Sequence, residues 1–431
     1  MSEDEKKPTT DLSRRALLGG VAATAGGVLL ERLRLDHAPL APATPAAAAA
    51  ADTTAAPQVP ADPTAAPGPG TSPVSARSPF EHPARTPAGV ITGPSYSPIH
   101  ELTGTITPSD LVFERHHAGV AMIDPKRYEL LVHGLVDRPM VFTLDDLMRF
   151  PSVSRTHFIE CSGNGRAGYR DPKPELSPQM IDGLTSNGEW TGVPLAVLLR
   201  EVGVRDSASW FLAEGGDAAK LSRSIPIAKA WDDAIVAYAF NGEPLRPANG
   251  YPARLFLPGY EANTCVKWLR RIKLIDQPNM SRDETSKYTD PLPNGTARQF
   301  SFVMDAKSVI THPAYPARLA GPGWVQISGL AWSGRGKIAR VDVSTDGGRT
   351  WTAAELQEPV LSRAHTRFRL MWEWNGRPAT LLSRAVDETG YAQPTLATFA
   401  AGRGKGTDFH FNHVRGWAVQ PDGRVLYEVP A

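Results

Sequence analysis

The stretch HFIECSGNGRAGY, residues 157–169, contains one of only two cysteines in a chain of 431 residues. The apolar run before Cys161 predicts a strand that ends at the cysteine. The Ser-Gly-Asn-Gly sequence that follows predicts a tight turn, because Gly and Asn adopt the backbone angles that turns need. Arg166 comes directly after this turn. The stretch therefore predicts a thiol at a strand end, beside exposed backbone N–H groups and a fixed positive charge.

Local chemistry leaves several interpretations of Cys161 open. A thiolate is a soft metal ligand, a nucleophile when a base such as His157 or His117 is close, and as a thiol it is a small buried hydrophobic group. Arg166 and the N–H groups of the turn are expected to lower the pKa of Cys161. A disulfide with Cys265 also remains open.

Bulk composition narrows the class of protein. A chain of 431 residues predicts two or three domains at about 100–200 residues per domain. The 46 Lys and Arg balance 45 Asp and Glu, so no positive field indicates nucleic-acid binding. There is no CxxCH motif for a covalently attached c-type haem, and we expect no haem in this chain.

The N-terminal region is typical of export followed by a linker. Residues 1–35 contain Arg14 and Arg15 before an apolar, Gly/Ala-rich run that is short and weakly hydrophobic for a membrane span. This pattern predicts a twin-arginine signal and a periplasmic location. Such signals export folded proteins, often with a cofactor already bound. Residues 36–79 are rich in Ala, Pro and Thr and are predicted to be a disordered linker.

Residues 80–300 predict an α+β domain with mixed sheets. A Thr that can cap a helix precedes apolar residues at helical spacing in residues 143–150. Residues 194–203 begin with Pro and end with Gly, which is typical of a helix. The predicted helices are 143–150 and 194–203; the predicted strands or strand–helix joins include 128–136, 254–259 and 266–275.

Residues 301–431 predict a β-sandwich of the immunoglobulin type. Alternating strands occur in residues 324–334, 338–356, 367–374 and 379–394, with turn residues between them. Asp346-Gly347-Gly348 predicts a hairpin turn.

Several segments, in order, resemble the sulfite oxidase family of molybdopterin enzymes. ECSGNGR (160–166) is similar to the family's molybdenum-ligand turn, a Cys-x-Gly-Asn-x-Arg pattern. FERHHAG (113–119), EWTGVPLAVLL (189–199), RSIPIAKA (223–230), residues 236–274 and ARVDVSTDGGRTW (339–351) also match. The resemblance covers about residues 95–430. It implies a molybdopterin domain at 80–300 and an immunoglobulin-like dimerisation domain at 301–431.

The resemblance also implies roles for individual residues. Cys161 is the expected molybdenum ligand, and Gly163 and Gly165 are expected to let the backbone approach the cofactor. The expected substrate-pocket residues are Arg115, Arg166, Tyr288 and Arg415. The expected pterin contacts are Phe113, His117, Asp217, Ser224, Asn249, Arg254 and Lys267. Asn249 replaces a histidine of the vertebrate enzymes, and Cys265 is expected to pack near the pterin without binding metal.

The implied activity is oxidation of sulfite or protein-bound sulfane sulfur by oxygen-atom transfer from molybdenum. Residues 258–273, 282–313 and 410–423 look most like the molybdenum subunit of the bacterial sulfane dehydrogenase of the sulfur-oxidising (Sox) system. That resemblance implies a c-type cytochrome as electron acceptor, a sulfur-carrier protein or small sulfur oxyanion as substrate, and a homodimer or a heterotetramer with the cytochrome. The alternatives are a sulfite dehydrogenase outside a Sox system, a non-catalytic exported binding protein and a Cys–His hydrolase.

Overall fold

A computed structural model describes residues 68 and 70–429. The predicted export signal at 1–35 lies outside the described residues, as does the predicted linker except for residues 68 and 70–79. Ala76 to the last described residue form one compact unit. No helix among the described residues has the length and apolar character needed to cross a membrane.

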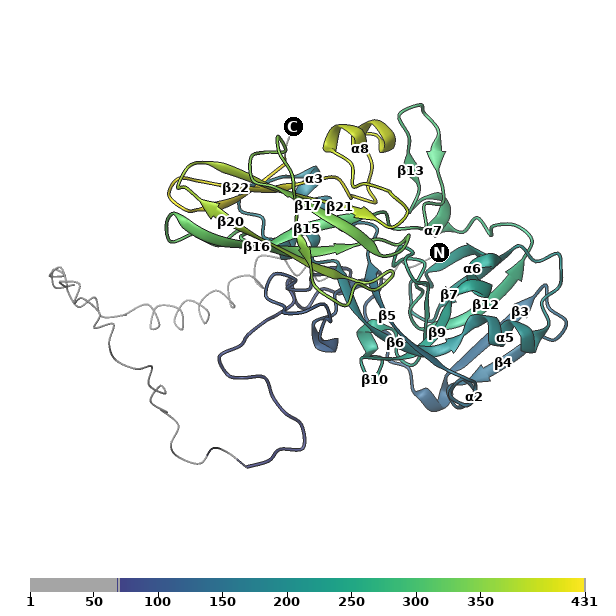
Figure 1. The fold of residues 1–431 in the computed structure, drawn as a ribbon. Helices are drawn as coiled ribbons and strands as arrows, with labels where there is room; N and C mark the ends of the chain where they lie inside the picture. Colours follow the sequence, from purple (N-terminus) through teal and green to yellow (C-terminus); the bar gives the residue numbers. More distant parts are fainter. Residues whose placement is uncertain (1–67, 69, 430–431) are drawn as a thin grey trace, which may run out of the picture. The chain divides into compact units, whose positions relative to one another are not determined.

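Two five-stranded sheets build the first half of this unit (blue and teal in Figure 1). One has the order β4 (Met140–Thr143), β3 (Glu129–Gly134), β12 (Leu269–Ile275), β7 (Trp210–Gly215) and β8 (Ser222–Pro226). The other has the order β10 (Glu243–Pro244), β9 (Ile235–Phe240), β6 (Thr185–Pro194) and β5 (Val153–Glu160), with β11 (Arg254–Phe256) paired to β9. The β3–β12 pair is parallel and the other pairs in these two sheets are antiparallel, as a mixed α+β domain predicts.

Short helices and two small two-stranded sheets complete the first half. The helices are α2 (Leu144–Arg149), α3 (Arg166–Arg170), α4 (Pro178–Asp182), α5 (Leu195–Val202), α6 (Ile227–Asp232) and α7 (Arg282–Thr285), with 3-10 turns η1 (Ser109–Leu111), η2 (Pro125–Arg127) and η3 (Pro247–Asn249). Two further two-stranded antiparallel sheets pair β1 (Gly93–Ser95) with β2 (Glu114–His116) and β13 (Asp290–Pro291) with β14 (Ala297–Arg298). Thr143 caps α2 through a capping box, as predicted.

Two antiparallel sheets packed face to face form the second half, as predicted (green and yellow in Figure 1). One contains β15 (Lys307–His312), β16 (Gly323–Trp332), β20 (Thr366–Trp374) and β19 (Glu355–Leu356). The other contains β18 (Thr352–Ala353), β17 (Ile338–Ser344), β21 (Ala379–Asp387), β22 (Gly416–Val419) and β23 (Val425–Glu428). Helix α8 (Leu396–Arg403) precedes the return to β22. Positive φ angles of Gly347 and Gly348 form the predicted turn between β17 and β18.

A buried charge cluster joins the two halves beside the 157–169 stretch. Glu160, the last residue of β5, accepts hydrogen bonds from Lys307 Nζ at 3.1 Å, Trp332 Nε1 at 2.6 Å and Asn164 Nδ2 at 2.9 Å. Lys307 also pairs with Asp182 of α4 at 2.8 Å. No more than 4% of the side chain of Glu160, Lys307 or Asp182 is exposed. The start of the turn is therefore fastened to β15 and β16 of the second half.

We expect Lys307→Met to lower the free energy of unfolding by about 3–5 kcal/mol, because it removes the ammonium group that two buried carboxylates share. Lys337→Met is the matched control, since Lys337 is exposed, and we expect a change within about 0.5 kcal/mol. Chemical denaturation of both variants measures the difference. Equal stabilities would contradict the assignment of the cluster as a structural junction.

Candidate functional site

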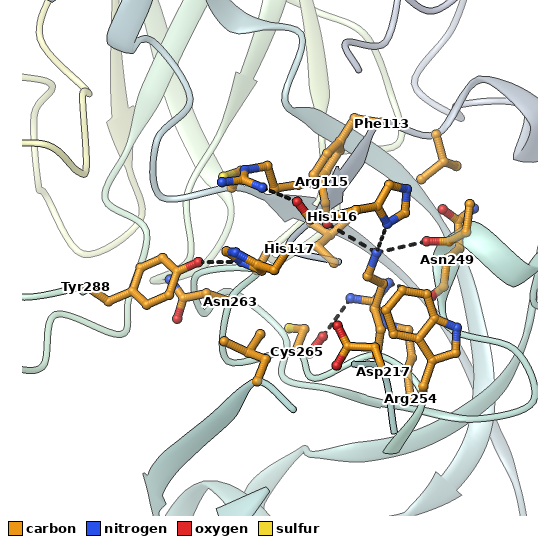
Figure 2. A pocket seen from close by; sticks show the side chains of 18 residues that line it. Phe113, Arg115, His116, His117, Asp217, Asn249, Arg254, Asn263, Cys265 and Tyr288 are labelled. Atoms are coloured by element: carbon orange, nitrogen blue, oxygen red, sulfur yellow. Dashed lines mark hydrogen bonds between the residues drawn. The ribbon is translucent and has the colours of Figure 1, made fainter. Parts of the chain in front are cut away.

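A cavity that is partly open to solvent lies in the first half of the chain. It is lined by the 112–117 segment, the end of β5, the loops near Asp217, Asn249 and Asn263, and Tyr288 (Figure 2). The cavity therefore brings together segments that are far apart in the sequence.

Most of the residues predicted for the site line this cavity. They are Phe113, Arg115, His117, Cys161, Asp217, Asn249, Arg254, Lys267 and Tyr288. Ser224, Arg166 and Arg415 are not among its lining residues. Cys265 lines it as a buried residue whose sulfur accepts a hydrogen bond from Leu257 N at 3.3 Å, and both cysteines are free thiols. The disulfide interpretation is therefore wrong.

The turn after β5 is held by backbone hydrogen bonds. Cys161 N donates to Leu184 O at 3.0 Å, and Asn164 N donates to Cys161 O at 2.9 Å. Gly165 has φ +97°, and a Cβ at this position would come within 2.9 Å of Phe411 Cβ and 2.7 Å of Arg415 Nη1. Glycine is therefore required here by the packing of the second half.

The expected role of Gly163 and Gly165 in admitting the cofactor stays a prediction, and the structure shows which side chains lie beside them. Gly165 faces Phe411 and Arg415, which are not lining residues of the cavity. A Cβ on Gly163 would meet the guanidinium of Arg166 at 3.3 Å. Both glycines make room for protein side chains.

Burial sets the thiol chemistry of Cys161. Burial raises the pKa of Cys161, while the Gly163 N–H group and the charges of Arg115 and Arg166 act in the opposite direction. The expectation of a lowered pKa is therefore wrong for the protein without a bound group, because desolvation of the thiolate outweighs the charges. A cation bound at the sulfur would supply the missing stabilisation of the thiolate.

Three cationic side chains converge on the cavity. Arg254 donates to Asn249 O at 2.9 Å and to Cys265 O at 2.8 Å, but its buried Nε has no partner among the described residues. Burial lowers the pKa of Arg254 to about 10 and that of Lys267 to about 7. Arg115 donates to His116 O and also lines the cavity. The cavity therefore carries a strong positive potential suited to anionic groups.

Asp217 supplies a hydrogen-bond acceptor near the cationic donors of the cavity. Its Oδ1 atom is buried and has no hydrogen-bond partner among the described residues. A buried unpaired acceptor is costly, so such an atom indicates a missing donor. Gly250, at φ +112°, keeps the backbone clear beside Arg254 and Lys267, where a Cβ would come within 3.2 Å of both. An acceptor, an unpaired guanidinium nitrogen and a thiol in one cavity fit a group with N–H donors, an anionic part and a metal.

Tyr288 and His117 form a neutral pair in the cavity wall. The hydroxyl of Tyr288 lies 3.0 Å from His117 Nε2. Burial and the nearby Arg115 lower the pKa of His117 to about 4, and burial raises the pKa of Tyr288. At neutral pH an uncharged phenol and an uncharged imidazole therefore share this hydrogen bond.

Arg166 lies at the edge of the second half and does not line the cavity. Its guanidinium is half-exposed, donates to Asp408 O at 3.2 and 2.6 Å, and lies 5.5 Å from the ring of Phe409. Phe409 in turn packs against Tyr288 with ring centroids 5.3 Å apart. Arg166 therefore acts on the cavity through its charge, which opposes the effect of burial on the pKa of Cys161.

Arg415 and Ser224 also support the site from outside. Arg415 is buried, lies 3.4 Å from Asp182 Oδ1 and donates to Phe411 O at 2.5 Å, behind the glycine turn. Ser224 is buried on β8; its hydroxyl bonds Glu284 at 3.2 Å and accepts from Asn279 N at 2.9 Å. Ser224 is not a lining residue of the cavity, and its pterin contact stays a prediction.

Sequence reasoning missed His116, Trp268 and Asn263, which also line the cavity. The doubled histidine in FERHHAG was a usable signal, but only His117 was selected. Asn263 donates to Ser162 Oγ at 3.1 Å and accepts a hydrogen bond from the buried Arg223. Trp268 adopts φ +52°, which no sequence pattern indicated.

Family comparisons place two domains on this chain. Residues 117–283 match the oxidoreductase molybdopterin binding domain, and residues 298–415 match the Mo-co oxidoreductase dimerisation domain. These matches follow the division between the two halves of the fold.

Similar proteins include mitochondrial sulfite oxidase of Mus musculus, 33% identical over 68% of this chain and 58% of that protein. Sulfite oxidase of Gallus gallus is 30% identical over 67% of this chain and 68% of that protein. The chain thus spans about three fifths of the mouse protein's length. The crystal structure of the sulfane dehydrogenase SoxCD from Paracoccus pantotrophus is similar with a TM-score of 0.82 and 44% identity, over 86% of this chain and 98% of that chain.

The two thiols are expected to differ in reactivity when the protein is free of bound groups. Iodoacetamide should label Cys161, which is partly exposed, and leave Cys265, which is 1% exposed, unmodified. Because the pKa of Cys161 is raised, the rate should increase about tenfold per pH unit from pH 7 to 9. Peptide mass spectrometry measures both rates, and labelling of Cys265 before Cys161 would contradict this placement.

Proposed function

Because the chain belongs to the sulfite oxidase family of molybdopterin oxidoreductases, we propose that it oxidises an inorganic sulfur substrate and passes the electrons to a c-type cytochrome. The substrate is sulfite or protein-bound sulfane sulfur. The observation that carries the proposal is one cavity that combines the Cys161 thiol, three cationic side chains and the unpaired Asp217 acceptor. The 44% identity to a sulfane dehydrogenase favours sulfane sulfur.

Family membership indicates molybdenum–molybdopterin as the cofactor, and the residues of the cavity fit it. Cys161 would hold the metal. Asp217 Oδ1 would accept from a pterin N–H group, while Arg254 and Lys267 suit its phosphate. When bound, the cofactor supplies the two-electron redox chemistry and oxygen-atom transfer to sulfur.

The chain's own residues would bind and orient the substrate. Arg115 lines the cavity, and its planar guanidinium offers a positive, fork-shaped partner to a sulfur oxyanion. Tyr288, turned toward the neutral His117, can redirect its hydroxyl to a substrate oxygen. Arg166 adds long-range attraction from the edge of the cavity while it remains bonded to Asp408 O. These contacts set binding and orientation and leave the electron chemistry to the cofactor.

A Cys–His hydrolase with His157 as base does not fit this geometry. His157 Nδ1 lies 3.2 Å from Ser362 O, and the imidazole stacks on Phe256. His157 is not among the cavity-lining residues. His117 does line the cavity, but its Nε2 faces Tyr288.

Partners and location follow from the same proposal. A one-electron cytochrome acceptor matches the SoxCD similarity, and the match to a dimerisation domain supports a dimer or a heterotetramer with the cytochrome. The arginine pair at Arg14 and Arg15 supports twin-arginine export to the periplasm.

Steady-state reduction of cytochrome c tests the proposed function. Purified holoenzyme is assayed with sulfite, with thiosulfate, and with thiosulfate plus sulfur-carrier proteins. We expect activity with at least one substrate, strongest with the carrier proteins, and none above background for Cys161→Ser. Wild-type activity with none of them, in protein shown to contain molybdenum and pterin, would contradict the proposal.

Arg115→Gln is expected to raise the KM for the anionic substrate by about tenfold or more, with a smaller change in kcat. The lost charge-assisted contact is worth about 1.5–3 kcal/mol in the ground state as well as the transition state. Arg155→Gln is the matched control, because Arg155 is exposed on β5 and should leave KM unchanged. Equal KM values for the two variants would remove Arg115 from the substrate site.

A further inference from the structure

His116 separates the cofactor cavity from a second, outer groove. It lines the cavity together with Lys267, and it lines the groove together with Arg85 and Glu114. The groove offers about 1160 Å³ of space and is more open than the cavity. His116 itself is only 3% exposed, so it forms part of the wall between the two spaces.

The hydrogen bonds through this wall have a defined direction. Lys267 Nζ lies 2.9 Å from His116 Nδ1, and it also donates to Ala248 O at 3.0 Å and Arg115 O at 3.2 Å (Figure 2). When Lys267 is an ammonium group it can only donate, so Nδ1 is then the acceptor. His116 Nε2 therefore carries the hydrogen and donates to Glu114 Oε2 at 2.8 Å. The order from the cavity outward is Lys267, His116, Glu114.

The fold holds these three groups in line. Glu114 and His116 lie on β2, which pairs with β1. The imidazole of His116 stacks on Trp268 with centroids 6.1 Å apart, and Lys267 Nζ lies 4.4 Å from the centroid of the same ring. Glu114 is partly exposed and is the outermost of the three hydrogen-bonded residues. Arg85 forms an ion pair with it in the groove.

The surrounding charges suit proton exchange near neutral pH. The charged groups that act on Lys267 and Glu114 are Arg254, Glu114, Asp217, Arg115, His116 and Arg85. Burial is the main cause that lowers the pKa of Lys267 to about 7, and the charges of Arg254 and Arg115 act in the same direction. The carboxylates of Glu114 and Asp217 act in the opposite direction. The hydrogen bond from His116 lowers the pKa of Glu114. In the protein free of bound groups, Lys267 can therefore lose and regain a proton near neutral pH, and Glu114 returns to the carboxylate.

We propose that Lys267, His116 and Glu114 form a proton path between the cofactor cavity and the outer groove. The inference rests on the proposed function. Oxidation of a sulfur atom with one oxygen from water releases two protons and two electrons. The electrons leave one at a time to the cytochrome, and the protons must leave the cavity.

One transfer along the path balances as follows. The N–H bond at Lys267 Nζ breaks as one forms at His116 Nδ1, and the N–H bond at Nε2 breaks as an O–H bond forms at Glu114 Oε2. Glu114 then gives its proton to water in the groove. Lys267 takes up a proton from the cavity. When the imidazole rotates toward the groove, Nδ1 gives its proton to water there and Nε2 takes one from water, and rotation back restores the first tautomer.

Glu114→Gln and His116→Gln test the path in holoenzyme assayed by cytochrome c reduction at saturating substrate. The amide introduced by Glu114→Gln keeps an acceptor for Nε2–H but cannot take up a proton, so the fold should survive. We expect kcat per molybdenum to fall by about tenfold or more in both variants. The solvent deuterium isotope effect on kcat should rise. His312→Gln is the matched control, since His312 is exposed at the end of β15, and it should leave both values unchanged.

Chemical rescue separates proton transfer from a structural role. His116→Ala leaves a gap beside the groove, and added imidazole should restore kcat in proportion to its concentration. A series of imidazoles should restore it according to their pKa. Wild-type kcat and isotope effect in Glu114→Gln, or reduced kcat without rescue in His116→Ala, would overturn the proton path.

A second measurement does not depend on activity. In protein labelled with ¹⁵N-histidine, the resonances absent from His116→Gln identify His116. We expect the neutral Nε2–H tautomer, and protonation of Nδ1 throughout pH 6–8 would overturn the proposed order. Failure of the wild type to oxidise any sulfur substrate would instead contradict the proposed function, while the tautomer still decides whether the relay exists.

Discussion

The site depends on how the turn after β5 is fastened between two buried charge clusters. On one side Glu160 is bonded to Lys307 and Trp332 of the second half. On the other side His410 N donates to Ser162 O at 2.7 Å, and the His410 imidazole lies 3.1 Å from Glu261. Cys161 lies between these two anchor points. Buried ion pairs add little net stability on average, but losing one partner is costly. We infer that these clusters serve to fix the position of the thiol.

The same arrangement explains how the second half contributes to the site although it does not line the cavity: it holds the turn that carries Cys161. Residues from β15, β16 and the 408–415 segment contact the turn, while the cavity wall comes from the first half. Burial then determines the chemistry of that wall. It keeps His117 neutral and brings the pKa of Lys267 close to neutrality, while Arg115 and Arg254 maintain the positive potential. A cofactor with an anionic part, a metal at the thiol and an oxyanion substrate all fit this balance.

Much of the fold could be predicted from local patterns, and much of the site from the resemblance. Thr143 and Gly347 mark a helix start and a hairpin because their chemistry acts within a few residues. Arg166 and Arg415 could be selected as arginines near the site, but their orientation depends on carbonyl groups of Asp408 and Phe411, which lie 242 and 4 residues away. The first of these contacts, between distant parts of the chain, leaves no local signal. The raised pKa of Cys161 was missed for a similar reason, because burial is a property of the folded chain.

The central claim is that this fastened turn presents the Cys161 sulfur to the molybdenum. X-ray absorption at the molybdenum edge measures the sulfur neighbours of the metal directly. For wild-type holoprotein and Cys161→Ser protein with equal pterin content, we expect one fewer sulfur neighbour in the variant. An identical sulfur shell in the two proteins would contradict the claim.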